Sequence, residues 1–380
     1  VKTILYSLDM HITAEEPGYL TVEIPTYRVD VTREADITEE VLRIYGYDNI
    51  GISSEMHSML SHTEKPDREK VAANMSDMLA ANGFAEIMCN SLSPAAWFET
   101  TGDFDIQKMV RLANPLSSDL NVMRMSLLPG MLNTISWNIN RQNGNLRLFE
   151  LGYTYGRKEG KGTLEITDNY SEKQLLAIAL TGNMNEKRWN APEMQSGFFH
   201  LKGYIEMVLS RFGISRHDTV ATEDKEGWFA EGIRYTSGSL EVASFGKVSR
   251  KYLAMFDIRQ EVFYGEIIWE NILRLIKSHT IRYSELPKYP WVRRDLALLL
   301  DKSVRFSQIS DLAFKTEKNI LHEVDLFDLY ESESIGKDKK SYAVSFILRD
   351  DRQTLTEKNI EKTMGALIKA FERELGATLR

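Results

Sequence analysis

Apolar and polar residues near the start of the chain follow first the two-residue period of a strand and then the spacing of a helix. The predicted strand has apolar residues at every second position, Leu20, Val22 and Ile24, and Pro25 ends it because proline cannot extend a central strand. The predicted helix begins near Asp36, and its apolar residues are Ile37, Val41, Ile44 and Tyr45. The pattern therefore predicts a small α/β unit over residues 1–50.

Residues 67–278 alternate between helical and strand patterns. A helix is predicted by apolar residues at Val71, Met75 and Leu79, and Gly83 is typical of the position that follows a helix end. Further helices are predicted over residues 128–135 and 198–213, and strands near residues 86–92, 108–112, 146–152 and 175–180. We expect these elements to form one larger core, reached through a Ser- and Gly-containing linker at residues 51–66.

The end of the chain follows the order strand, helix, strand, strand, helix. The strands are predicted over residues 292–301, 323–330 and 341–349, and the first helix over residues 306–317. The last helix has Thr356 as its N-cap and Gly376 just past its end, and residues 378–379 close a short last strand. This order predicts a ferredoxin-like α+β sandwich over residues 285–380, so the chain as a whole is predicted to be a multidomain α+β protein.

Composition narrows the class of protein. No window approaches the roughly 18 consecutive apolar residues of a membrane span, and no signal peptide opens the chain, so we expect a cytoplasmic protein with no membrane contact. The net charge of −8 argues against a surface covered with phosphate-binding residues, although residues 285–380 carry as many basic as acidic residues and permit local RNA contacts. The single cysteine, Cys89, is predicted to be a buried structural thiol. Because the chain starts at Val1 inside an apparent helix, we expect a segment of a longer protein.

Four carboxylates surround the predicted start of the N-terminal helix: Asp30, Asp36, Glu39 and Glu40. One interpretation is a capping box, with Asp36 as the N-cap and Glu39 reaching back to the N-cap amide, while Glu40 interacts favourably with the helix dipole. The other interpretation is a Mg²⁺ site, because a hard divalent cation prefers carboxylate oxygens. Both roles can hold at once.

The sequence of residues 25–50, which contains these carboxylates, resembles that of a known family. Two motifs are similar to the B5 domain of bacterial phenylalanyl-tRNA synthetase beta subunits. They are Pro-Thr-Tyr-Arg-Val-Asp at residues 25–30 and Asp-Ile-Thr-Glu-Glu-Val-Leu-Arg-Ile-Tyr-Gly-Tyr-Asp-Asn-Ile at residues 36–50. The resemblance implies that Asp30, Asp36, Glu39 and Glu40 bind Mg²⁺ where this subunit meets the alpha subunit.

The middle of the chain resembles the B6-B7 region of the same family. The matching sequence motifs are Asn-Pro-Leu-Ser at residues 114–117, Met-Arg-Met-Ser-Leu-Leu-Pro-Gly at residues 123–130 and Phe-Glu-Leu-Gly at residues 149–152. The resemblance implies a class II synthetase-like core, with an antiparallel sheet and helices, that has lost its activity. Arg124 and Arg147 could stand in for the arginine that holds the ATP α-phosphate, but no Gly-x-Gly-x-x-Arg strand and no Walker-type loop accompanies them, so we predict no catalytic residue in this chain.

Sequence motifs in the C-terminal part of the chain resemble the same family. Two motifs are similar to the ferredoxin-fold anticodon-binding (B8) domain: Lys-Tyr-Pro-Trp-Val-Arg-Arg-Asp-Leu-Ala at residues 288–297 and Val-Asp-Leu-Phe-Asp-Leu-Tyr at residues 324–330. The resemblance implies that this domain holds the anticodon loop of phenylalanine tRNA, through stacking on aromatic rings and cationic contacts with phosphates. The candidate residues are Arg293, Arg294, Phe327, Tyr330, Lys339, Lys340 and Arg352. The alternative for each is structural: Arg294 pairs with a sheet carboxylate, the two lysines form a solvated hairpin, and both aromatic residues belong to the core.

Taken over the whole chain, the resemblance implies the C-terminal portion of a beta subunit that joins two alpha subunits and a second beta subunit in a heterotetramer. That enzyme uses ATP and Mg²⁺ to attach phenylalanine to its tRNA, with the chemistry on the alpha subunit; the family's N-terminal tRNA-binding and editing domains are expected to be missing here. Two alternatives stay open. A scaffold that binds RNA without a ligase partner would use the same C-terminal residues, whereas a free-standing Mg²⁺-dependent hydrolase would need a base that the sequence does not offer.

Overall fold

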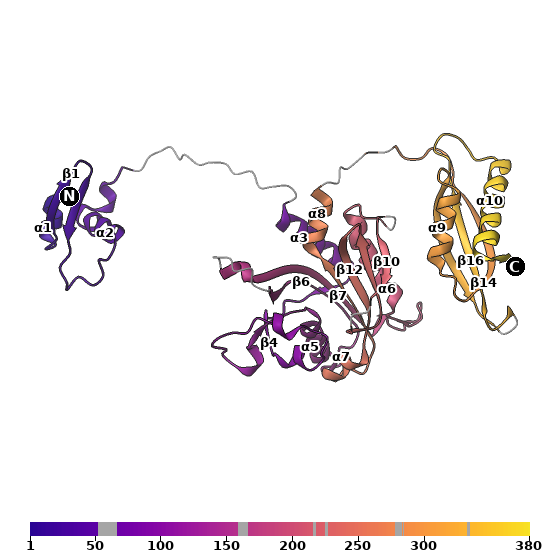
Figure 1. Ribbon diagram of the computed structural model, residues 1–380, viewed down its shortest axis with the longest axis horizontal. Coiled ribbons are helices and arrows are strands. Elements are labelled where there is room, and N and C mark those ends of the chain that lie inside the picture. Colours follow the sequence, from indigo (N-terminus) through magenta and orange to yellow (C-terminus); the bar gives the residue numbers. More distant parts are fainter. Residues whose placement is uncertain are drawn as a thin grey trace. The chain divides into compact units, whose positions relative to one another are not determined.

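A computed structural model describes residues 1–51, 67–158, 166–215, 218–224, 227–277, 283, 285–332 and 335–380 (Figure 1). Its internal contacts divide the chain into two units, Val1–His279 and Thr280–Arg380. The finer predicted division into 1–50, 51–66 and 67–278 stays a prediction, and all of the predicted linker except Gly51 lies outside the described residues.

The first 51 residues form a small α/β fold. Its elements are α1 (Lys2–Ser7), β1 (His11–Glu16), β2 (Tyr19–Glu23), α2 (Glu34–Tyr45) and the 3₁₀ turn η1 (Tyr47–Asn49). The strands β1 and β2 pair antiparallel, and the fully buried residues between the hairpin and the helices are Leu5, Met10 and Val31. The predicted strand over 20–24 is confirmed, whereas the helix begins at Glu34, two residues before the predicted start.

The larger part of the first unit is built on a seven-stranded sheet. Its strand order is β10-β11-β12-β13-β7-β6-β3, and every pair is antiparallel except β3 with β6. The strands are β3 (Ala85–Glu86), β6 (Leu146–Arg157), β7 (Tyr170–Thr181), β10 (Val220–Glu223), β11 (Phe229–Ser237), β12 (Leu240–Val248) and β13 (Val262–Ile268). Two small two-stranded sheets lie outside this sheet: β4 (Leu92–Ser93) pairs with the distant β5 (Val122–Met123), and β8 (Asn183–Asn185) forms a hairpin with β9 (Met194–Gln195).

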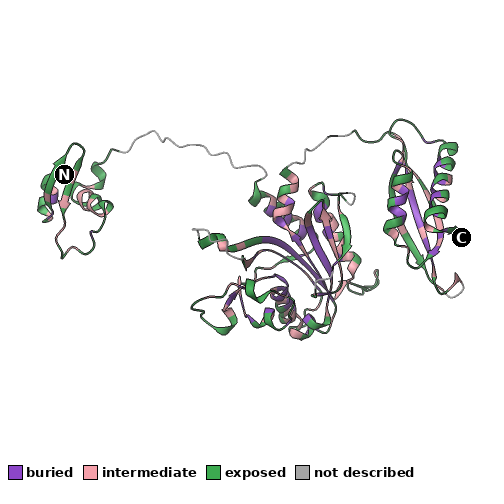
Figure 2. Cartoon of the chain, viewed as in Figure 1, coloured by how far each residue is buried: buried purple, intermediate pink, exposed green. Residues whose placement is uncertain are grey.

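Helices bury apolar residues on both faces of this sheet, and the buried residues concentrate along its central strands (Figure 2). One face packs against α3 (Arg68–Ala81), α6 (Phe198–Arg211) and α8 (Trp269–Lys277). The other face packs against α5 (Leu128–Ile139) and α7 (Arg250–Met255), and the short helix α4 (Ala96–Glu99) has its own small cluster. Apolar side chains on both faces explain why Leu175 to Leu180 is a continuous buried run rather than an alternating one.

Three predictions for this core need correction. The strand predicted near residues 86–92 is replaced by two short strands, β3 and β4, with no strand over residues 87–91. The strand predicted over residues 108–112 is absent from the described structure: a 3₁₀ turn, η2 (Ile106–Lys108), is followed by a single bridge between Arg111 and Val122. The strands flanking residues 157–174 are longer than predicted, since β6 runs to Arg157 and β7 begins at Tyr170 after the turn η4 (Ile166–Asn169). Residues 170–174 of β7 pair with β6 but extend past β13, so most of their polar side chains are not buried and their pattern did not predict a strand.

The second unit is the predicted ferredoxin-like sandwich. Its elements are β14 (Val292–Asp301), α9 (Phe306–Thr316), β15 (Leu321–Tyr330), β16 (Lys339–Leu348), α10 (Glu357–Leu375) and β17 (Thr378–Leu379), and the strand order is β15-β16-β14-β17. Both helices pack on one face of the sheet through a single buried cluster. The last helix begins and ends as predicted: the Thr356 hydroxyl accepts from the Asn359 amide, and Gly376 has the left-handed conformation, with a φ of 60°.

None of the helices in the described part of the chain is long and apolar enough to cross a membrane.

Candidate functional site

The start of α2 is capped by Asp36, although in a different position from the predicted one. Arg33 is the N-cap and Asp36 is the third helical residue, so its carboxylate reaches back to accept from the amides of Thr32 and Arg33 at 2.9 and 2.8 Å. These two backbone hydrogen bonds are the main reason that the pKa of Asp36 lies below its usual value. Glu39, which the sequence assigned to this reciprocal bond, is exposed.

Arg28 occupies the space between two of the other carboxylates. Its Nη2 lies 3.1 Å from an oxygen of Glu40 and 3.4 Å from an oxygen of Asp30, and Arg43 lies 2.6 Å from the same Glu40 oxygen. The bond from Arg43 and then the bond from Arg28 hold the pKa of Glu40 low, and the bond from Arg28 lowers the pKa of Asp30. Two guanidinium groups, those of Arg28 and Arg43, therefore already balance the charge of this pair.

The arrangement of these side chains does not fit a Mg²⁺ ion as it stands. Their carboxylate oxygens are suitable ligands, but Asp36 is engaged with backbone amides, and Asp30 and Glu40 share Arg28. No three acidic, histidine or cysteine side chains gather to form a metal site within the described ranges.

The open face of the C-terminal sheet carries an arginine beside an aromatic ring. Alternate residues of β14 pack on the helices, which leaves Arg293 on the opposite face. Phe327 lies at a register shift between Leu326 and Asp328, and the guanidinium carbon of Arg293 is 5.1 Å from the centre of its half-exposed ring. Arg293 also pairs with Asp295 at 2.9 Å. The structure thus brings together two residues that the sequence singled out separately.

A second pair of this kind includes a residue that sequence reasoning missed. Tyr330 pairs in register with Ser341 on the open face, and the guanidinium carbon of Arg380 lies 4.7 Å from the centre of its ring. Arg380 follows β17, which pairs with β14, and its amide donates to the carbonyl of Ala297. The predicted last strand was the available signal, because a basic residue directly after it must lie at the edge of the same sheet.

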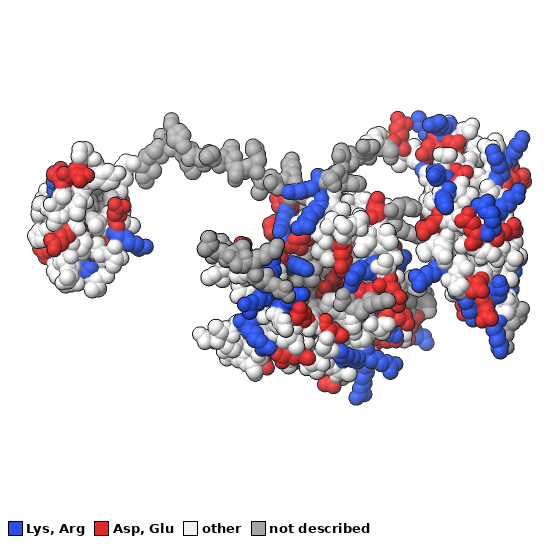
Figure 3. All heavy atoms as spheres, in the orientation of Figure 1, with Lys and Arg blue, Asp and Glu red and all other residues white. Residues whose placement is uncertain are grey.

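The other predicted cations lie in different surroundings. Arg294 donates to Glu357 at 2.8 Å, so it has a structural partner, but the carboxylate belongs to the first residue of α10 and not to the sheet as predicted. Lys339 is partly exposed and Arg352 is exposed. Lys340 is only 8% exposed; its ammonium donates to the carbonyl of Lys302 and lies 4.6 Å from the ring centre of Tyr342, so we correct its assignment to a structural one. On the face shown in Figure 3, basic and acidic residues are interspersed over this unit.

The two arginines considered for a nucleotide site have structural partners. Arg124 is buried, pairs with buried Glu150 at 2.6 Å and donates to the carbonyls of Tyr153 and Cys89. Arg147 donates to the carbonyls of Asn82 and Met184 at 3.3 and 2.6 Å. Arg124 is thus held in the core by an ion pair and two backbone carbonyls, where it borders one cavity, and Arg147 lines another.

Comparison with known proteins places these features in a family. Residues 52–269, more than half of the chain, match the model described as the phenylalanyl tRNA synthetase beta chain CLM domain. The chain belongs to the phenylalanyl-tRNA synthetase beta chain family. Residues 1–47 match the tRNA synthetase B5 domain, and residues 287–380 match the ferredoxin-fold anticodon binding domain. Each predicted part of the phenylalanyl-tRNA synthetase beta chain is therefore present in the predicted order.

Curated relatives of this phenylalanyl-tRNA synthetase beta chain segment agree. The phenylalanine--tRNA ligase beta subunit of Bacteroides thetaiotaomicron is 42% identical over 383 residues, and that of Bacteroides fragilis is 40% identical over the same length. Each match covers 100% of this chain and 47% of the relative, so the chain spans about half the length of these relatives. Among solved structures, the pyrrolysyl-tRNA synthetase of Desulfitobacterium hafniense is 17% identical with a TM-score of 0.42, and covers 56% of this chain and 70% of its own.

Proposed function

We propose that this chain is the anticodon-binding and scaffolding portion of a phenylalanine-tRNA ligase, the enzyme that attaches phenylalanine to its tRNA with ATP. The observation that carries the proposal is the open sheet face in residues 287–380, where Arg293 with Phe327 and Arg380 with Tyr330 form two arginine-aromatic pairs. Single-stranded loops are bound by stacking of bases on such rings while guanidinium groups contact phosphates. Lys339 and Arg352 are the proposed outer phosphate contacts, whereas Arg294 alternates with Arg293 onto the helix face and pairs there with Glu357.

The chemistry is proposed to lie on an alpha subunit, in a complex of two alpha and two beta subunits in the cytoplasm. The support is the use of Arg124 for a buried ion pair with Glu150 and for bonds to the carbonyls of Tyr153 and Cys89, because it would have to give up these partners to hold an ATP phosphate. The arrangement of the N-terminal carboxylates does not support the alternative of a free-standing Mg²⁺-dependent hydrolase. Three of these four carboxylates are held by arginines or backbone amides.

Reconstitution tests this division of labour. The chain is purified alone and together with its alpha subunit, and phenylalanine-dependent ATP-pyrophosphate exchange is measured for each. We expect association and exchange with the pair only. Exchange by the chain alone would refute the non-catalytic assignment, and failure of the two chains to associate would refute the subunit assignment and favour the RNA-binding scaffold.

Magnesium is a separate proposal, and Arg28 provides its test. Because the guanidinium of Arg28 lies between Asp30 and Glu40, a Mg²⁺ ion would have to replace it. Arg28→Ala should therefore bind Mg²⁺ more tightly than the unaltered chain in calorimetry, and Arg28→Ala with Glu40→Gln should lose the gain. If neither the unaltered chain nor Arg28→Ala binds Mg²⁺, these carboxylates have a capping and pairing role only.

A further inference from the structure

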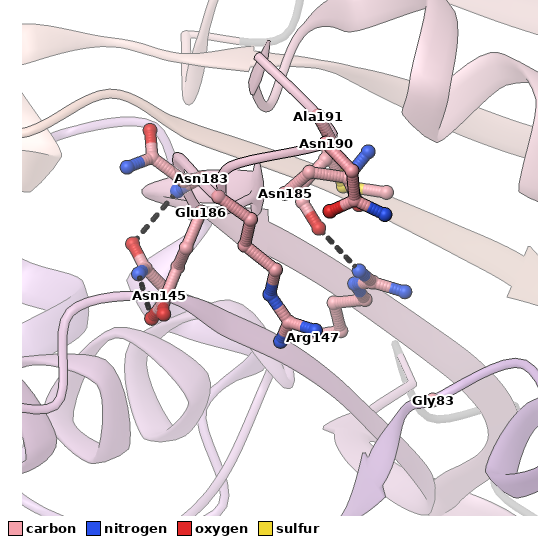
Figure 4. Close-up of a pocket in the computed structure, with 10 residues that line it drawn as sticks. Gly83, Asn145, Arg147, Asn183, Asn185, Glu186, Asn190 and Ala191 are labelled. Atoms are coloured by element: carbon pink, nitrogen blue, oxygen red, sulfur yellow. Dashed lines mark hydrogen bonds between the residues drawn. The ribbon is translucent and has the colours of Figure 1, made fainter. Parts of the chain in front are cut away.

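A polar cavity of about 570 Å³ lies between the sheet and the β8–β9 hairpin of the first unit (Figure 4). Asn145 and Arg147 reach it from the start of β6, and the hairpin contributes most of the other wall. The lining residues that bear charge are Arg147, Glu186 and Arg188, and Asn145 lies beside Glu186. None of the family's sequence features that led to the proposed function falls on this hairpin.

The lining is amide-rich and cationic. The carbonyls of Asn82 and Met184 fix the position of Arg147 without neutralising it. The single lining carboxylate, Glu186, accepts from the Asn145 amide at 3.1 Å. Within the ranges that the structure describes, no salt bridge joins Arg147 or Arg188 to a carboxylate. Two guanidinium groups among side-chain amides form a suitable environment for a phosphate, which guanidinium groups and neutral N–H donors bind.

The tip of the hairpin carries an exposed indole next to this cavity. Mutual backbone bonds between Arg188 and Ala191, at 3.0 and 3.4 Å, close a two-residue turn of Trp189 and Asn190. Trp189 is 98% exposed, and it follows exposed Lys187 and Arg188. Both faces of this indole are therefore open to a stacking partner, and two cations precede it in the sequence. Exposed aromatic rings flanked by cations are the standard platform for stacking an unpaired base.

We propose that the β8–β9 hairpin is a second RNA contact of this chain, with a backbone phosphate in the cavity of Arg147 and Arg188 and an unpaired base stacked on Trp189. The inference rests on the proposed function, because the RNA is the tRNA whose anticodon loop the C-terminal unit holds. A protein partner would favour an apolar pocket at the centre of its interface. Here the lining is mainly amide and guanidinium groups, which favours RNA.

The test compares two RNAs on the same variants. Binding of full-length phenylalanine tRNA and of its isolated anticodon stem-loop is measured for the unaltered 380-residue chain, Trp189→Ala and Arg188→Ala. Arg141 stacks on half-exposed Trp137 of α5, outside the cavity, so Trp137→Ala and Arg141→Ala are matched controls. We expect Trp189→Ala to weaken full-length tRNA binding about 5- to 100-fold. Arg188→Ala should reduce the salt dependence by about one counterion. Stem-loop binding and the controls should not change.

Unchanged binding of full-length tRNA to both hairpin variants would overturn the inference. So would an equal loss for both RNAs, and so would a loss confined to binding of the alpha subunit, which would make the hairpin a protein contact. If the unaltered chain binds full-length tRNA but not the stem-loop, the anticodon proposal fails while this inference is still decided by the variants. If it binds neither RNA, both fail.

Discussion

The side chain of the last residue, Arg380, lies over the ring of Tyr330, with its guanidinium carbon 4.7 Å from the ring centre. The two residues come from opposite edge strands of the C-terminal sheet, β17 and β15, so the contact spans the open face. A cation that lies on an exposed ring can move to a phosphate when a base takes its place on the ring.

Arg380→Ala should therefore weaken binding of the anticodon stem-loop and lower the salt slope by about one. Arg373→Ala is the matched control, because Arg373 is an exposed arginine on α10 that pairs with its neighbour Glu374. Fluorescence titrations at several salt concentrations measure both effects. Equal salt slopes for the two variants would show that Arg380 makes no phosphate contact.

Asp36→Ala should loosen the start of α2. The substitution removes the acceptor for the amides of Thr32 and Arg33, so these amides should exchange faster with deuterium, whereas Asp36→Asn keeps an acceptor and should lose less. The folded-state pKa of Asp36 is lowered, so its stabilisation is present above the ordinary aspartate pKa of about 3.9 and is lost as the pH falls through the lower folded value. Equal protection in all three proteins at neutral pH would contradict this role.

This helix start also shows where sequence reasoning reaches its limit. The capping chemistry and the helix were predictable from residue types and period, but the position of Asp36 in the cap was not, because Asp, Ser or Thr is the usual N-cap and here Arg33 takes that place. The position of Arg28 between Asp30 and Glu40 depends on the fold of the turn before the helix, which no periodicity reports. By contrast, the C-terminal sandwich was predicted nearly residue by residue, since its strands and helices are long, regular and separated by clear caps.

Contacts between segments that are distant in the sequence could not be predicted either. The pairing of Arg124 with Glu150 joins the segment before α5 to the middle of β6, and neither residue type nor spacing indicates it. The approach of Arg380 to Tyr330 likewise requires the strand order of the sheet. Residues with a family motif could be singled out, but which of them face solvent could not.

Arg124→Met should destabilise the first unit by about 3–5 kcal/mol, because it leaves the Glu150 carboxylate buried without its cation. Arg124→Met combined with Glu150→Leu should recover much of this loss, since an apolar pair avoids the buried charge. Urea unfolding followed by tryptophan fluorescence measures both. If the single variant is as stable as the unaltered chain, the ion pair is not enclosed as described.

Glu266→Gln should change the pH dependence of stability. Burial is the main reason that the pKa of Glu266 is raised, although Tyr264 and Ser126 donate to its carboxylate at 2.5 and 3.2 Å. A raised folded-state pKa means that the contribution of Glu266 is fully present below the ordinary glutamate pKa of about 4.3 and is lost as the pH rises through the folded value. The variant should therefore gain stability relative to the unaltered chain as the pH rises from 4 to about 8. A difference in the midpoint of unfolding that does not depend on pH would contradict this assignment.

The most direct measurement is the affinity of the phenylalanine tRNA anticodon stem-loop for the unaltered chain, Phe327→Ala, Tyr330→Ala and the control Leu329→Ala, a half-exposed apolar residue of the same strand. The stacking proposal predicts a loss of about 1–3 kcal/mol for each aromatic variant. The control should show little change. Unaltered affinity in both aromatic variants, or an equal loss in the Leu329→Ala control, would contradict the proposal that the open sheet face holds the anticodon loop.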